Sequence, residues 1–211
     1  MSLSGPTCFR PLSRIVAIIF VLAVLLLLPA CWVYSVEPLY EERILNPDPD
    51  LTFDQTLVGS WAQVDVDCVW ILSIEAVQQR YELTMAPAPD CKTEDKVTHY
   101  EAHLVKLDNH HFLDVSPKGD DVCDLCLPLH SFLLVSQEAD RLALVPVDHE
   151  WLSRALTEKK VSLASLASQE LGNAVVLTAS TKELKDFARK YADDKAAFKT
   201  GSEFKLKFKR K

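Results

Sequence analysis

The sequence His-Tyr-Glu-Ala-His-Leu-Val-Lys-Leu at residues 99–107 decides the fold, because its apolar and polar side chains alternate. Tyr100, Ala102 and Leu104 fall on one face of an extended chain, where side chains two residues apart point the same way. Residues 81–85 show the same alternation. A period of two predicts half-buried strands rather than helices.

Further runs of this kind lie on both sides of that stretch, and turn-forming residues separate them, as at 87–90, 108–109, 117–120 and 138–140. Short strands with regular turn signals predict a mainly antiparallel β-sheet or a partly closed barrel. The expected strands are 58–66, 68–76, 111–115, 130–135, 142–147 and 174–178.

Two helices and a last strand are expected after residue 147, so the fold class is α+β. Asp148 is a suitable N-cap for the first helix, and Ser180 with Glu183 fits the capping box of the second. In the last strand, Leu206 and Phe208 alternate with lysines. We expect an edge strand whose lysine face prevents edge-to-edge aggregation.

The N-terminus has the features of an export signal. Arg10 and Arg14 precede the unbroken apolar run 15–28, and Cys31 follows a small residue. Leu28-Pro29-Ala30-Cys31 resembles the bacterial lipobox, with Pro29 in place of the usual small or β-branched residue. The resemblance implies lipidation of Cys31. Because Trp32 rather than Asp follows, it also implies an outer-membrane lipoprotein facing the periplasm.

The alternative is an uncleaved signal anchor reaching residue 34, which would make the chain a single-pass inner-membrane protein. The expected organisation is a signal peptide at 1–30, a tether at 31–56 with a reach of about 25 Å, and one exported β-rich domain at 57–211. The net charge of -7 becomes -9 without residues 1–30. An acidic chain is a poor nucleic-acid binder, so the expected partners are the membrane and other envelope proteins.

Gly59 and Trp61 in the first strand, the strand meander, and the late helix and last strand are similar to the order in lipocalins and other calycins. The domain also resembles uncharacterised exported bacterial proteins built as one β-rich unit. The calycin resemblance implies a barrel that carries an apolar small molecule.

Four cysteines remain for pairing in an oxidising compartment, and they allow three pairings. We favour Cys68 with Cys91 and Cys123 with Cys126. The spacing Cys123-x-x-Cys126, four residues before His130, also suits a thiol-redox pair or a zinc site. A fourth zinc ligand would come from the other histidines, His99, His103, His110 or His111.

The chain lacks the common nucleotide-binding, hydrolase and metalloprotease motifs, so we predict no catalytic residue and no cofactor. The predicted function is that of a membrane-anchored, non-enzymatic binding or structural protein of the envelope. A calycin-like carrier and a thiol or zinc protein are the alternatives.

Overall fold

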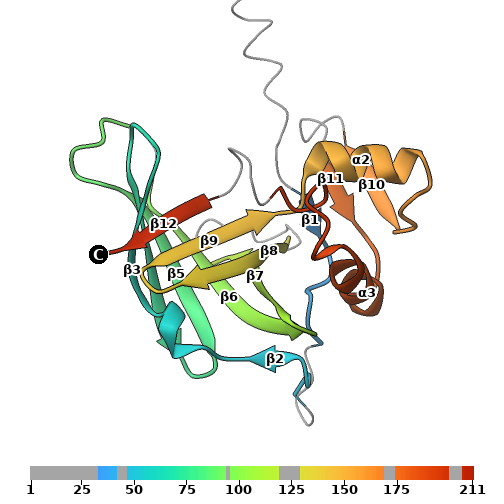
Figure 1. Cartoon of the computed structure of the whole chain (residues 1–211), viewed down its shortest axis with the longest axis horizontal. Helices are drawn as coiled ribbons and strands as arrows, with labels where there is room; N and C mark the ends of the chain where they lie inside the picture. Colours follow the sequence, from blue (N-terminus) through green and yellow to red (C-terminus); the bar gives the residue numbers. More distant parts are fainter. Residues whose placement is uncertain (1–32, 42–46, 94–95, 119–128, 169–173, 200–205) are drawn as a thin grey trace, which may run out of the picture.

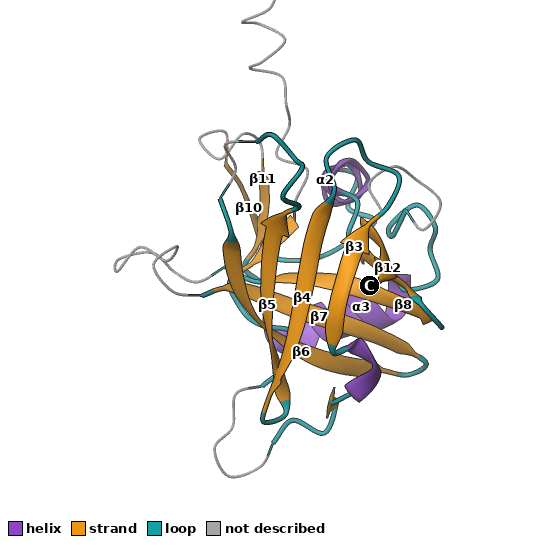
Figure 2. Cartoon of the chain, turned by 90° about the vertical axis from the view of Figure 1, so that its left-hand side faces the viewer, coloured by secondary structure: helices purple, strands orange, loops and turns teal. Residues whose placement is uncertain are grey.

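The computed structural model describes residues 33–41, 47–93, 96–118, 129–168, 174–199 and 206–211. Its largest unit is a closed, eight-stranded antiparallel barrel (Figures 1 and 2). This confirms the predicted α+β class, and the barrel is closed in full rather than in part. The strands are β3 (Gly59–Gln63), β4 (Trp70–Val77), β5 (Arg80–Pro87), β6 (Thr98–Leu107), β7 (His110–Pro117), β8 (Ser131–Glu138), β9 (Arg141–Pro146) and β12 (Leu206–Arg210).

The last strand closes the barrel. Phe208 is in register with Leu142 of β9 on one side and with Gln63 of β3 on the other. The expectation that β12 is an edge strand was therefore wrong, because both of its edges are hydrogen-bonded. The alternation itself is confirmed: Phe208 is buried inside the barrel, while Lys207 and Lys209 lie on the outer wall.

The two ends of the barrel differ. At the end that we call the turn end, two-residue turns at 78–79, 108–109 and 139–140 join the hairpins. At the other end, the loop end, the connections 64–69, 88–97 and 118–130 are longer. The disulfide Cys68–Cys91 joins two of these long connections, which confirms this predicted pairing.

Apolar side chains fill the barrel interior. Trp61 and Tyr81 are completely buried and Phe208 is almost so. Leucines from the neighbouring strands pack around them in one cluster, which includes Leu72, Leu83, Leu104, Leu113, Leu133, Leu142 and Leu144.

A second layer covers the outer wall of β6 to β9. It consists of helix α2 (His149–Thr157), helix α3 (Thr181–Tyr191) and a small sheet of β1 (Val33–Ser35), β11 (Ala174–Leu177) and β10 (Ser165–Ser168). Both predicted caps are present, since Asp148 accepts a hydrogen bond from Trp151 N–H and Ser180 forms a capping box with Glu183. The layer and the barrel wall share one apolar cluster, in which Phe112, Phe132, Phe187 and Phe198 contribute aromatic rings.

The segment expected to be a tether is part of the fold wherever the structure describes it. Val33–Ser35 forms β1, in parallel with β11. Leu39 and Tyr40 are buried in the shared cluster, and β2 (Leu51–Thr52) pairs with β6. A short 3-10 helix, η1 (Gln55–Leu57), then leads into the barrel. The reach of about 25 Å that a free chain of this length would have therefore does not apply to these residues.

Within the described ranges, no helix combines the length and apolar character that crossing a membrane requires.

Candidate functional site

A buried carboxylate–imidazole pair joins the barrel to the N-terminal segment. Asp114 of β7 has 1% of its surface exposed, and its Oδ1 lies 2.7 Å from Nδ1 of His130. Its Oδ2 accepts a hydrogen bond of 2.7 Å from the backbone N–H of Leu39. His130 and Ser35 exchange two backbone hydrogen bonds of 2.9 Å. Strand β7, strand β1 and the residue that directly precedes β8 therefore meet at this pair.

Ser35, His130 and Asp114 are the three residue types of a serine hydrolase triad, but their arrangement does not support that chemistry. The Ser35 hydroxyl is buried and has no hydrogen-bond partner among the described residues, so the imidazole does not activate it. All three residues are buried, so a substrate has no access to them. The geometry instead suits a polar joint, in which two strong hydrogen bonds hold the N-terminal segment on the barrel.

The histidines that could complete a zinc site are distributed over the molecule. His99 lies 3.2 Å from the Thr84 hydroxyl, and the His103 ring contacts Tyr40 with 4.3 Å between centroids. His110 pairs with Asp193 at 2.9 Å. The described part of the chain contains no group of three or more potential metal ligands. Cys123 and Cys126, and the predicted lipidation site Cys31, lie outside the described residues.

Sequence reasoning missed a cluster of ion pairs that joins helix α3 to residues 48–50. The Lys185 ammonium lies 2.6 Å from Asp48 and 2.7 Å from Asp50, and Arg189 lies 3.0 Å from Asp50. Burial by itself raises the pKa of Asp48, but hydrogen bonds from Lys185 and from the backbone N–H groups of Glu41 and Asp50 outweigh it. The pKa of Asp48 consequently lies below its ordinary value.

A second missed feature is the contact between the first and last strands of the barrel. The Arg210 guanidinium lies over the Trp61 ring, 4.2 Å from its centroid, and donates hydrogen bonds to the carbonyls of Thr56 and Val58. Gly59 has a φ of +142°, and a Cβ at this position would lie 2.8 Å from the Arg210 side chain. The positive φ therefore favours glycine here, and any larger residue would also displace the end of the Arg210 side chain.

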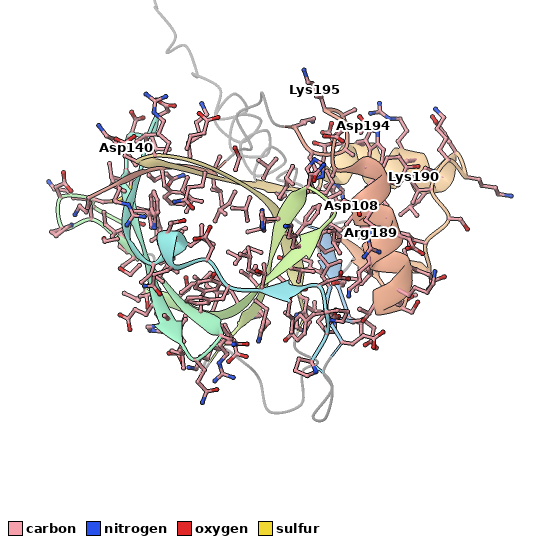
Figure 3. The ribbon with its side chains drawn as sticks, turned by 60° about the horizontal axis from the view of Figure 1, so that its bottom comes forward. Asp108, Asp140, Arg189, Lys190, Asp194 and Lys195 are labelled. Atoms are coloured by element: carbon pink, nitrogen blue, oxygen red, sulfur yellow. A yellow bond between two sulfur atoms is a disulfide. The ribbon has the colours of Figure 1, made fainter. Side chains whose placement is uncertain are left out.

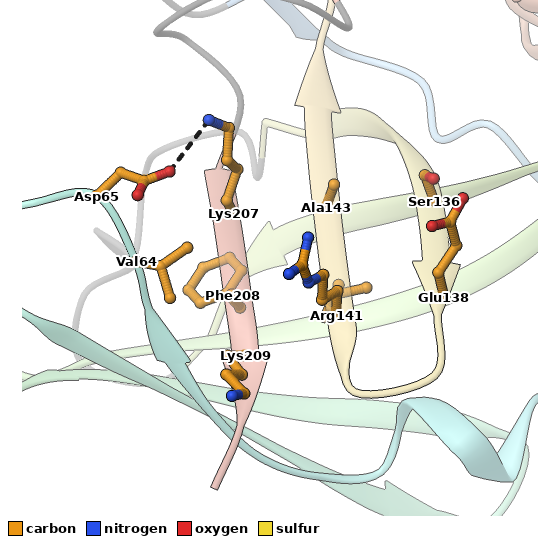
Figure 4. A pocket seen from close by; sticks show the side chains of 10 residues that line it. Val64, Asp65, Ser136, Glu138, Arg141, Ala143, Lys207, Phe208 and Lys209 are labelled. Atoms are coloured by element: carbon orange, nitrogen blue, oxygen red, sulfur yellow. Dashed lines mark hydrogen bonds and ion pairs between the residues drawn. The ribbon is translucent and has the colours of Figure 1, made fainter.

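Among the described residues, a hollow lies on the outer wall of the barrel. It has a volume of about 480 Å³ and is open to solvent along β8, β9 and β12 (Figure 4). Ala143 forms its floor, because this small side chain is surrounded by longer ones. Charges of both signs form its rim: Asp65, Glu138, Arg141, Lys207 and Lys209.

The rim charges differ in how well they are neutralised. Lys207 pairs with Asp65 at 3.1 Å, and Lys209 lies 3.7 Å from Asp140. Arg141 and Glu138 face each other across the β8–β9 hairpin, yet neither forms an ion pair with a described residue. Among the described residues of this outer groove, Arg141 and Glu138 are thus the charges that remain for a partner to neutralise.

Comparison with known proteins gave no match to any family model, curated protein or solved structure.

Proposed function

We propose that this protein is an exported, membrane-anchored domain that binds another envelope protein and catalyses no reaction. The observation that carries the proposal is the filled interior of the barrel combined with an open, charged groove on its outer wall. A barrel with Trp61 and Tyr81 completely buried at its centre has its binding surface outside. The groove has the mixed polar character that is common at protein interfaces.

The groove favours a polar peptide segment over a small apolar ligand. Arg141 can form a bidentate contact with a carboxylate of the partner. Glu138 can accept hydrogen bonds from donor groups of the partner. Its apolar lining consists of Val64, Leu142, Ala143 and Phe208. All of these except Val64 are buried, so little apolar surface is left for a ligand to cover. We therefore expect a contact determined by charge, whose association weakens as salt is added.

Photo-crosslinking in cells tests the binding site. A benzophenone amino acid replaces Ser136 in the groove or, as a matched control, Glu75 on the outer wall of β4. We expect a discrete adduct from position 136 and none from position 75. The adduct should disappear when Arg141→Glu is added. Equal crosslinking from both positions, or an adduct that persists with Arg141→Glu, would contradict the proposed site.

Membrane anchoring is tested with the full chain in a double-membraned bacterial host. A lipoprotein loses residues 1–30 and gains acyl mass on Cys31, and Cys31→Ala prevents both changes. A signal anchor keeps the full mass in both forms. A protein that is released from the membrane fraction with neither acyl mass nor leader would overturn the anchoring part of the proposal.

A calycin-like carrier is the second candidate, because the closed eight-stranded barrel is compatible with it. Titration with an apolar fluorescent dye distinguishes the two functions. The filled interior predicts no saturable binding by the native protein. The variant Phe208→Ala opens space inside the barrel and serves as a comparison. Tight binding to the native protein would favour the carrier.

A further inference from the structure

The N-terminal segment enters the domain at the loop end of the barrel. The backbone carbonyl of Val33 accepts a hydrogen bond of 2.8 Å from the hydroxyl of Ser131, the first residue of β8. Strand β8 begins at the loop end, and Figures 1 and 2 show the small sheet beside that end. Whatever holds residues 31 and 32 is therefore close to the loop end.

The predicted anchor leaves almost no free chain. Only Trp32 stands between Cys31 and Val33, and two residues span at most about 7 Å. An uncleaved anchor would also have to end by Trp32, because Tyr34 belongs to β1. In either case the membrane surface and the loop end are neighbours.

Exposed aliphatic side chains occur in the connections at the loop end and in the small sheet beside it. Among the described residues, three large hydrophobic side chains are exposed: Val66 (40%), Val97 (46%) and Leu166 (62%). Val66 lies in the β3–β4 connection and Val97 directly precedes β6, so both are at the loop end. Leu166 is in register with Val176, which is itself in register with Tyr34, the residue after Val33.

The turn end has the opposite character. Its three turns consist of Gln78, Gln79, Asp108, Asn109, Ala139 and Asp140, none of which is a large apolar residue. Figure 3 shows Asp140 far from Arg189 and Lys190 of α3, whereas Asp108, in another of these turns, lies beside that helix. The difference between the two ends is what a domain with one side toward a bilayer and one toward water requires.

We propose that the loop end rests on the membrane surface, with Val66, Val97 and Leu166 inserted among the lipid headgroups. This proposal rests on the proposed anchoring, and it adds an orientation to it. By sequence, the three connections at the loop end carry eight acidic and three basic residues, so a neutral lipid surface suits this end better than an anionic one. The outer groove then remains open to the side, where a second protein can reach it.

Electron paramagnetic resonance measures this orientation. A keto amino acid that carries a nitroxide label replaces Lys96 at the loop end or Asn109 at the turn end, about 33 Å apart along the ten residues of β6. The membrane-purified protein is placed in neutral phosphatidylcholine vesicles that contain a nickel-chelating lipid. We expect strong relaxation enhancement at position 96 and none above background at position 109.

A linker tests the three side chains separately from the short anchor. With twelve Gly/Ser residues inserted before Val33, the enhancement at position 96 should persist, and it should be lost when Val66, Val97 and Leu166 are all changed to Ser. Persistence in the triple variant would overturn the contact. Equal enhancement at positions 96 and 109 in protein that is membrane-bound would overturn the orientation while leaving the anchoring intact. Protein that is released from the membrane fraction with neither acyl mass nor leader would overturn both.

Discussion

The Lys185 ion-pair cluster provides a sharp test of how the N-terminal segment is held. The Asp48 carboxylate accepts hydrogen bonds from Glu41 N–H at 2.7 Å, from Asp50 N–H at 2.9 Å, and from the Lys185 ammonium at 2.8 and 2.6 Å. The variant Lys185→Met keeps the length and apolar stem of the side chain but leaves Asp48 as an uncompensated buried charge. Breaking a buried pair in this way costs about 3–5 kcal/mol.

We place the cost of Lys185→Met at the lower end, about 3 kcal/mol, because two backbone N–H groups still bind the carboxylate. With a urea slope of about 2 kcal/mol/M, the unfolding midpoint should fall by about 1.5 M. Tryptophan fluorescence during urea unfolding measures this shift. Lys182→Met on the same helix is the matched control, since the pair between Lys182 and Asp186 is exposed and should contribute little.

The lowered pKa of Asp48 also predicts how the free energy of unfolding changes in acid. Because the folded-state pKa of Asp48 is lowered, its stabilising contribution is complete above the unfolded-state pKa of about 3.9 and is lost as the pH falls below it. Asp48→Asn should therefore make the free energy of unfolding less dependent on pH below pH 4. The reasoning fails if Lys185→Met and Lys182→Met shift the urea midpoint equally, or if Asp48→Asn leaves the acid slope unchanged.

Three further changes test the barrel and the polar joint. Phe208→Ala removes a buried ring from the interior and should cost about 3–5 kcal/mol in urea unfolding; a cost below 1 kcal/mol would mean that the interior is not tightly packed. Gly59→Ala should cost about 1–3 kcal/mol, because it strains the backbone and displaces Arg210. Asp114→Ala should speed amide hydrogen exchange in residues 36–41, since the Leu39 N–H loses its acceptor; unchanged exchange there would contradict the role of the joint.

The meander could be predicted from sequence because each strand carries its own signal. The alternation in β5 and β6 is local, as are the N-cap at Asp148 and the capping box of α3, and all of these are confirmed. Closure of the barrel by β12 could not be predicted, because it depends on pairing with strands far away in the chain. The strands β1 and β2 were missed for a related reason: they have only three and two residues, in a segment that is rich in proline.

The sequence contains a weak signal of the polar joint between Asp114 and His130. Asp114 lies in the apolar stretch Phe112-Leu113-Asp114-Val115 of β7, and an isolated carboxylate in such a position needs a buried partner. Its partner could not be deduced, because His130 and Leu39 come from distant parts of the chain. Spacing alone makes His130 a possible zinc ligand, whereas the fold pairs it with Asp114.

Asp114 and Asp48 together explain why the N-terminal segment is an integral part of the domain. Both carboxylates are buried, and both accept backbone N–H groups from residues 39–50. Detaching this segment would remove the Leu39 N–H from the buried Asp114 and would take Asp48 and Asp50 away from the buried ammonium of Lys185. Leaving such polar groups inside the protein without their partners is costly. An anchor at Cys31 would therefore pull directly on the folded domain, and its orientation at the membrane would be determined by the fold rather than by a flexible linker.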